Sequence, residues 1–219
     1  MCDFMFAQLP PVAGARVLEV GAGIGTFSAL LLEAGARELL LLEPEAACVA
    51  ELERRFAGDS RVEIRAEELP SAPSLSACEF DVALSQNVLE HVEDDAAAVA
   101  AMARALRPGG RLTALVPAHP CLYGALDRAY GHHRRYTRER LATIVRRAGL
   151  EIERLYRFNA LGVPGWWVRN RTGATGIGTA PLRAYDALLA AWHPIESRLE
   201  PPFGLSLIVH AMRPGHAAG

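Results

Sequence analysis

The segment VLEVGAGIGTF, Val17–Phe27, constrains the fold of this chain more than any other part of it. It is typical of a buried strand that runs through a glycine loop into a helix. Gly21, Gly23 and Gly25 let the backbone turn sharply and approach a ligand without interference from a Cβ atom. A strand, loop and helix in this order predict a nucleotide site at the carboxyl end of the first strand of an α/β sheet.

The rest of the chain supports an α/β fold. Short apolar runs alternate with longer helical patterns over the first two-thirds, which indicates βα units and a largely parallel sheet. The predicted strands are Arg16–Val20, Glu38–Leu42, Arg61–Arg65, Phe80–Leu84, Arg111–Val116, Glu151–Arg157 and Phe203–Ala211. The predicted helices are Thr26–Gly35, Pro44–Phe56, Asp94–Leu106, Thr137–Ala148 and Pro181–Trp192. No linker divides the 219 residues, so we expect a single domain, with irregular inserts at about 117–136 and 159–200.

Composition excludes several kinds of function. The net charge of −2 gives no support for a nucleic-acid partner. All 23 basic residues are arginine, which excludes Schiff-base chemistry and lysine general bases. No apolar run approaches the ~18 residues that span a bilayer, and the N-terminus lacks the features of a signal peptide. We therefore expect a cytoplasmic protein without an integral membrane segment.

Carboxylates near the glycine loop indicate which nucleotide binds. Glu19 ends the first strand, where it would repel the pyrophosphate of a dinucleotide but attract the ammonium and sulfonium of S-adenosylmethionine. The third glycine of a GxGxxG dinucleotide loop would stand at Thr26. Glu43 ends the second strand and can accept hydrogen bonds from both ribose hydroxyls, and Pro44 follows it in the same site. Glu67 either accepts from the adenine amino group or is an exposed loop acid.

Four ordered motifs carry a family resemblance: EVGAGIG, the acidic residue in LLEPE, DVALSQNVLEHVEDD and LRPGG. Together they resemble the class I S-adenosylmethionine-dependent methyltransferases of the type-11/12 group. The resemblance implies a Rossmann-like seven-stranded sheet in the order 3-2-1-4-5-7-6, with the last strand antiparallel, flanked by helices. It also implies that Gln86, Asn87 and Val88 line the methionine end of the cofactor, and that the two inserts form the acceptor site.

The first insert contains LDRAYGHHRRYT, which resembles a GHxRRYT segment of bacterial methyltransferases from glycan and secondary-metabolite gene neighbourhoods. His132 is the first candidate to take a proton from an acceptor hydroxyl. Arg135, Tyr136 and the variable His133 are candidates for acceptor binding, since arginines hold a carboxylate or phosphate bidentately. The alternative is that Asp127, His132 and Arg135 form a hydrogen-bond network that only pins the loop.

His91, in LEHVEDD, is the second catalytic candidate, and the alternative is that it packs beneath the cofactor. Asp94 and Asp95 raise the question of a metal, as in catechol-type methyltransferases. Helix N-capping explains them better, because acidic residues favour the first turn, and the lysine of that metal chemistry is absent. The sequence therefore predicts no metal.

Aromatic residues gather in the second insert. Phe158, Asn159, Trp166, Trp167 and Trp192 are expected to cover an acceptor pocket and exclude water. The alternative is packing in the core or between the subunits of a homodimer.

The sequence thus predicts transfer of a methyl group to a small molecule, with a secondary metabolite or a sugar-containing compound as acceptor. Oxygen is the favoured acceptor atom, because a nearby histidine helps most when a hydroxyl must lose a proton. Methylation of an amine or a carboxylate and a non-catalytic cofactor-binding protein are the alternatives. A nicotinamide-dependent oxidoreductase is disfavoured, because the chain has neither the third loop glycine nor a lysine.

Overall fold

The protein forms a seven-stranded sheet in the order β3-β2-β1-β4-β5-β7-β6. The computed structural model describes Phe6, residues 9–75 and 79–166, Trp192, Glu196 and residues 201–215. The strands are β1 Arg16–Val20, β2 Glu38–Leu42, β3 Val62–Arg65, β4 Phe80–Gln86, β5 Leu106–Pro117, β6 Glu151–Phe158 and β7 Ser206–Met212. Strands β1 to β5 pair in parallel, and β7 is antiparallel to β5 and β6. The strand order and the antiparallel last strand confirm the fold that the resemblance implies.

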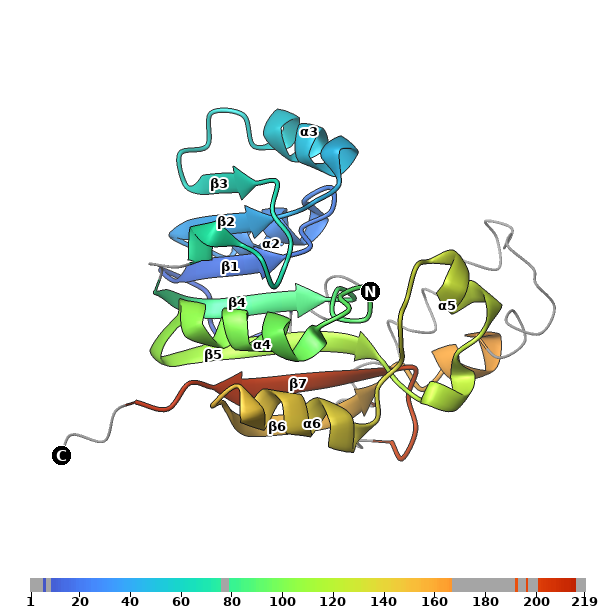
Figure 1. The fold of residues 1–219 in the computed structure, drawn as a ribbon. Coiled ribbons are helices and arrows are strands. Elements are labelled where there is room, and N and C mark those ends of the chain that lie inside the picture. The colour runs from blue at the N-terminus through green and yellow to red at the C-terminus, as the bar shows by residue number, and fades with distance from the viewer. Residues whose placement is uncertain are drawn as a thin grey trace.

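Helices cover both faces of this sheet (Figure 1). They are α2 Thr26–Glu33, α3 Ala46–Arg55, α4 Asp95–Ala105, α5 Ala125–Ala129 and α6 Arg138–Arg147, with 3-10 turns η1 Pro73–Leu75 and η2 Pro120–Leu122. Alternate residues of β1 enter two separate core clusters. Leu18 and Val20 pack in the cluster that includes residues of α4 and α6, while Val17 packs with residues of α2 and α3. Burial on both faces explains why the central strands read as continuous apolar runs.

The order of the strands reverses between β1 and β4, which are neighbours although two strands separate them in sequence. In an open α/β sheet, ligands bind outside the carboxyl ends of the strands at such a reversal. The glycine loop follows β1 and the segment Asn87–Asp94 follows β4, so both meet at this edge. The short helix α5 lies beyond the same edge (Figure 1).

Local differences from the sequence-based elements are small. The turn Arg107–Gly110 is part of β5, which begins at Leu106. The first insert contains the unpredicted helix α5, where the Asp127 carboxylate accepts a hydrogen bond from the Gly124 backbone N–H at 2.9 Å. The helix expected at 181–192 lies outside the described residues, apart from Trp192. None of the helices in the described part of the chain has the length and apolar sequence that a membrane crossing requires.

Candidate active site

The glycine loop brings backbone close to the segment that follows β4. Gly21 has a φ of 75°, and a Cβ atom at this position would collide with the side chain of Val88. Gly23 and Gly25 also have positive φ values, of 55° and 76°. The three glycines are therefore required by backbone conformation, and at Gly21 and Gly25 also by the close approach of side chains.

The Glu43 carboxylate holds this loop from the end of β2. One oxygen accepts from the Gly23 N–H at 2.8 Å, and the other accepts from the Glu45 N–H at 3.0 Å. Each carboxylate oxygen has a further lone pair. Glu43 can therefore shape the loop and still accept hydrogen bonds from a ribose.

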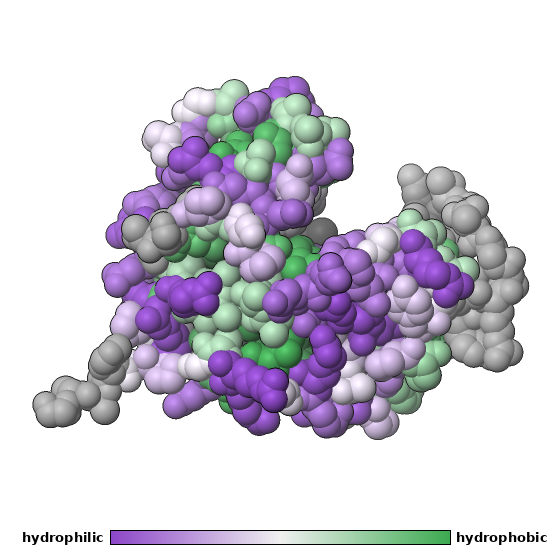
Figure 2. All heavy atoms as spheres, in the orientation of Figure 1, coloured by the Kyte–Doolittle hydropathy of each residue, from purple (hydrophilic) through white to green (hydrophobic). Residues whose placement is uncertain are grey.

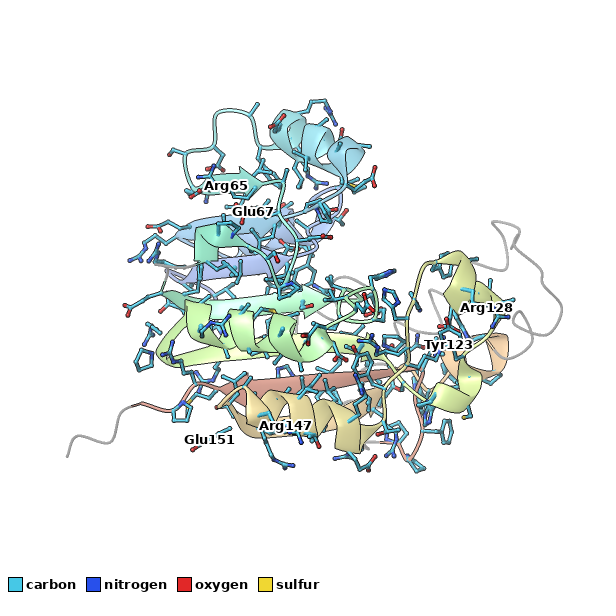
Figure 3. The ribbon with its side chains drawn as sticks, viewed as in Figure 1. Arg65, Glu67, Tyr123, Arg128, Arg147 and Glu151 are labelled. Atoms are coloured by element: carbon cyan, nitrogen blue, oxygen red, sulfur yellow. The ribbon has the colours of Figure 1, made fainter. Side chains whose placement is uncertain are left out.

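A cavity of about 430 Å³ opens beside the loop, and we call it the Glu67 cavity. Its lining is Val20, Gly21, Leu42, Pro44, Glu67, Glu68, Leu69, Pro70, Val88, His91, Val92, Glu93, Asp94 and His133. Figure 3 shows Glu67 just beyond the carboxyl end of β3. On the face drawn in Figure 2, the surface is hollowed between the parts that carry α3 and α5, with hydrophobic side chains at the floor. Four residues that the sequence assigned to the cofactor line this cavity: Gly21, Pro44, Glu67 and Val88.

Glu19 is buried at the end of β1, with 4% of its surface exposed. Its carboxyl accepts a hydrogen bond from the Ser28 hydroxyl of α2 at 2.6 Å. Burial raises the pKa of Glu19 to about 7, and the nearby Glu43 carboxylate also raises it, while the Ser28 hydrogen bond lowers it. The charge of Glu19 therefore changes near neutral pH.

A second cavity, of about 490 Å³, lies at the carboxyl ends of β4, β5 and β6, and we call it the Glu90 cavity. Its lining is Gln86, Asn87, Glu90, Leu115, Pro117, Tyr130, His132, Arg135, Phe158, Asn159, Trp166, Leu205 and Ser206. The sequence had assigned Gln86 and Asn87 to the cofactor, and His132, Arg135, Asn159 and Trp166 to acceptor chemistry. The structure brings these six residues into one cavity. Trp192 is not in the lining, and Trp167 lies outside the described residues.

The first insert is fixed by a buried network around Asp127, which is 0% exposed. The Asp127 Oδ1 atom lies 2.9 Å from His132 Nδ1 and accepts from Arg135 Nε at 2.8 Å. Arg135 also donates to the Ala118 carbonyl and lies over the Trp166 ring, 4.5 Å from its centre. Tyr123 donates to the His132 carbonyl at 2.8 Å, beside Arg128 (Figure 3). The network pins the loop and also fixes one ring nitrogen of His132, so that the other is available.

Three polar side chains meet where the two cavities adjoin. The His91 and His132 rings lie edge to face with centres 4.7 Å apart, and His132 Nε2 lies 4.0 Å from Glu90 Oε1. His91 belongs to the Glu67 cavity, while His132 and Glu90 belong to the Glu90 cavity. Burial lowers the pKa of His91, and the nearby His132 lowers it further. Burial raises the pKa of Glu90 to about 8.

The sequence interpretation missed Glu90 and Tyr130. Glu90 stands inside the quoted motif LEHVEDD, but a single charged residue beside a histidine gives no sign of its burial. The available signal was its position two residues after Val88, in a segment expected to line the cofactor.

Tyr136 lies apart from the cavity that holds the other acceptor candidates of the insert. It was expected to bind the acceptor, but it is fully buried and does not line the Glu90 cavity. Its hydroxyl donates to the Leu89 carbonyl and to Asp95, both at 2.9 Å. Burial raises the pKa of Tyr136, and the nearby Asp95 adds to this effect. Tyr136 therefore ties the insert to the start of α4.

His133 lies at the other cavity. It was also expected to bind the acceptor, but its side chain lines the Glu67 cavity. Its backbone N–H donates to the Glu90 carbonyl at 2.7 Å, which ties this part of the insert to the segment after β4. The two adjacent histidines contribute to different cavities.

Asp94 and Asp95 have structural roles at the start of α4. Asp94 is the N-cap, and its carboxylate accepts from the Ala97 N–H at 2.9 Å. Asp95 binds Arg140 through both oxygens at 2.9 Å and accepts from Tyr136. Helix capping is confirmed for Asp94, and Asp95 joins the helix to the insert.

The sheet order, the glycine loop and the carboxylates at the ends of the first two strands define a class I S-adenosylmethionine-dependent methyltransferase. A family model described as "Methyltransferase domain" matches residues 2–155. The chain therefore belongs to this methyltransferase family, and S-adenosylmethionine is its cofactor.

Curated relatives match over part of their length. The chain is 37% identical over 111 residues to a "Ubiquinone biosynthesis O-methyltransferase" of Xanthomonas axonopodis pv. citri (strain 306), a match that covers 50% of this chain and 46% of that protein. It is 40% identical over 103 residues to the protein of the same name from Xylella fastidiosa (strain 9a5c), covering 47% and 42%. The chain thus spans about half the length of the curated relatives it matches.

Solved structures share the fold over nearly the whole chain. An S-adenosylmethionine-dependent methyltransferase from Mesorhizobium loti has a TM-score of 0.68 at 22% identity and covers 95% of both chains. The N-methyltransferase NodS from Bradyrhizobium japonicum, in complex with S-adenosylhomocysteine, has a TM-score of 0.62 at 17% identity and covers 97% of this chain and 84% of that one.

Proposed function

We propose that this methyltransferase transfers the methyl group to a hydroxyl oxygen of a small molecule bound in the Glu90 cavity. The main support for the proposal is that the Glu67 cavity and the Glu90 cavity adjoin. The cofactor's adenosine fits the Glu67 cavity, where Glu67 and the apolar residues around it can hold an adenine. The methyl group then has to pass to the neighbouring cavity, and His91 and His132 stand at that boundary.

Oxygen is favoured because of the groups at the boundary. A hydroxyl must lose its proton as the methyl group arrives, and His91, His132 and Glu90 are the polar side chains placed to act on it. In-line displacement requires the acceptor oxygen, the methyl carbon and the sulfur to be aligned. Holding two ligands in adjoining cavities supplies that alignment. The curated relatives carry the name O-methyltransferase, which also favours oxygen.

The lining of the Glu90 cavity favours an acceptor with an aromatic or otherwise apolar body. Phe158, Trp166, Leu115 and Leu205 form much of its wall, beside a smaller set of polar side chains that includes His132. The sequence had favoured a secondary metabolite or a sugar-containing acceptor. The relatives are named for ubiquinone biosynthesis, so we propose a phenol-type hydroxyl on a small aromatic molecule. The cytoplasmic location and a homodimer stay predictions.

The test is a product analysis with methyl-labelled S-adenosylmethionine and three matched acceptors: a phenol, an aromatic amine and an aromatic carboxylic acid. The proposal expects a methyl ether from the phenol and much slower reaction of the other two. Methylation of the amine or the acid alone would overturn it. Tight binding of S-adenosylhomocysteine with no methyl transfer to any acceptor would support the non-catalytic alternative.

A further inference from the structure

The boundary between the cavities contains a fully buried carboxyl group that makes no hydrogen bond to the described part of the chain. Glu90 is 0% exposed, and neither of its carboxylate oxygens has a hydrogen-bond partner among the described residues. Buried carboxylates are normally paired or bound to a metal ion. The nearby Arg135 is already bound to Asp127 and to the Ala118 carbonyl, so it does not supply that partner.

Two imidazoles adjoin this carboxylate, each with one ring nitrogen already engaged. His132 uses Nδ1 for Asp127, at 2.9 Å, and its Nε2 lies 4.0 Å from Glu90 Oε1. His91 makes a hydrogen bond to the backbone of Gly131. One ligand atom from each of Glu90, His91 and His132 lies within 4.8 Å of the other two. Metal-binding histidines in proteins donate their second ring N–H to a carboxylate or a backbone carbonyl, which is the arrangement of both histidines here.

We propose that Glu90, His91 and His132 bind one divalent transition-metal ion, and that zinc fits this donor set best. Two imidazole nitrogens and one carboxylate oxygen favour zinc and related ions over magnesium and calcium, which prefer oxygen ligands. At a metal–ligand distance of about 2.1 Å, tetrahedral ligand atoms stand about 3.4 Å apart. To bind the ion, the ligand atoms of the three side chains would have to move closer to one another. The distances between them would shorten by between a few tenths of an ångström and somewhat more than 1 Å.

The location of the site connects it with the proposed function, on which this step rests. Three protein ligands leave at least one position open, as in catalytic zinc sites. The three ligand residues line the two cavities at their junction, where the acceptor hydroxyl has to lie. The bound ion would lower the pKa of the hydroxyl, whose proton passes to water. The oxygen then forms the bond to the methyl carbon as the carbon–sulfur bond breaks and leaves a neutral thioether. In this arrangement His132 acts through the ion and does not itself take the proton.

This site differs from the sequence-based expectation of no metal. That expectation weighed Asp94 and Asp95, which the structure assigns to helix capping and to Arg140. Two residues of the proposed site, Glu90 and His91, lie in the segment after β4. The third, His132, lies in the first insert. Only the fold brings them together, 42 positions apart in sequence between Glu90 and His132.

The experiment is a calorimetric titration of the full chain, stripped of metal with a chelator, with Zn²⁺ alone. We expect one zinc per chain and at least a tenfold weaker affinity in Glu90→Gln and His132→Gln. His119→Asn is the matched control, because it also removes a partly buried imidazole but lies outside the cluster. Asparagine tolerates the positive φ of 60° at that position, so this variant should bind zinc as the wild type does. Absence of stoichiometric binding, or binding that both cluster variants leave unchanged, would overturn the metal site.

Two further measurements keep the result interpretable if a variant folds poorly. X-ray absorption of the zinc-loaded wild type should show two imidazoles and light-atom ligands at about 2.0–2.1 Å, and a shell without imidazole would contradict the proposal. Titration with S-adenosylhomocysteine should give binding in the wild type and in His119→Asn, with or without zinc. Failure of that binding would count against the proposed function. Intact cofactor binding without zinc binding would count against the metal site alone.

Discussion

Glu19 provides a test of the electrostatics around the cofactor. Its pKa is raised from 4.5 to about 7, mainly by burial. In the unfolded chain the same carboxyl ionises near 4.5. Between these two pH values the folded protein holds a proton that the unfolded chain has released. The free energy of unfolding contributed by this group is therefore highest below pH 4.5 and is lost as the pH rises to 7.

The size of this effect follows from the shift. Each pKa unit corresponds to about 1.4 kcal/mol, so a shift of about 2.5 units is worth about 3 kcal/mol in total. Roughly 2 kcal/mol of this falls between pH 5.5 and pH 8.5. Glu19→Gln is neutral throughout and can still accept the Ser28 hydrogen bond. The variant should therefore gain about 2 kcal/mol relative to the wild type over that pH range, measured by urea unfolding without cofactor.

Cofactor binding should respond in the opposite sense. A cationic ligand favours the ionised form of Glu19, so S-adenosylmethionine should bind the wild type roughly tenfold more tightly at pH 8 than at pH 6. Glu19→Gln should lose that part of the pH dependence. Two results together would show that the Glu19 carboxyl does not titrate in this range, and they would refute the reasoning. The first is a free energy of unfolding that changes with pH equally in the two proteins, and the second is cofactor binding with the same pH dependence in both.

Two other substitutions test the packing of the site. Asp127→Asn leaves the buried Arg135 without its carboxylate, which should cost about 3–5 kcal/mol and lower the melting temperature by roughly 10 °C; a loss below about 1 kcal/mol would contradict a buried ion pair. Gly21→Ala places a Cβ against Val88 in the Glu67 cavity and should weaken S-adenosylhomocysteine binding by at least about tenfold if the cofactor binds there as proposed. Gly58→Ala is its control, because Gly58 has a similar φ of 80° but open space around it. Equal affinities in the two glycine variants would show that the close approach does not matter.

The sheet could be predicted because its signals are local. Val17, Leu18 and Val20 lie in a run of apolar residues that ends at glycines, and this pattern fixes both the strand and the turn after it. The order of the strands is not a local property. Nothing in the composition of β6 or β7 indicates that β7 inserts between β5 and β6, so this part came from the family resemblance.

The limits of prediction in the site are also a matter of distance along the chain. Tyr136 resembled a ligand-binding residue because it adjoins two arginines, whereas its partner Leu89 is 47 residues away. Glu43 was expected to bind ribose, and its hydrogen bonds to the loop backbone became visible only in three dimensions. Glu90 was missed because its burial, and its lack of a hydrogen bond to any described residue, are properties of the folded chain. Asp127, His132 and Arg135 were predicted as a set because they share one short insert.

The most direct test of the account is a crystal structure of the chain with S-adenosylhomocysteine. We predict that the adenine lies in the Glu67 cavity and that the sulfur lies at the boundary, facing Glu90, His91 and His132. The Glu90 cavity would then remain open for an acceptor next to the sulfur. A ligand whose sulfur points away from this boundary, or whose adenine occupies the Glu90 cavity, would contradict the assignment of the two cavities and the route of methyl transfer built on it.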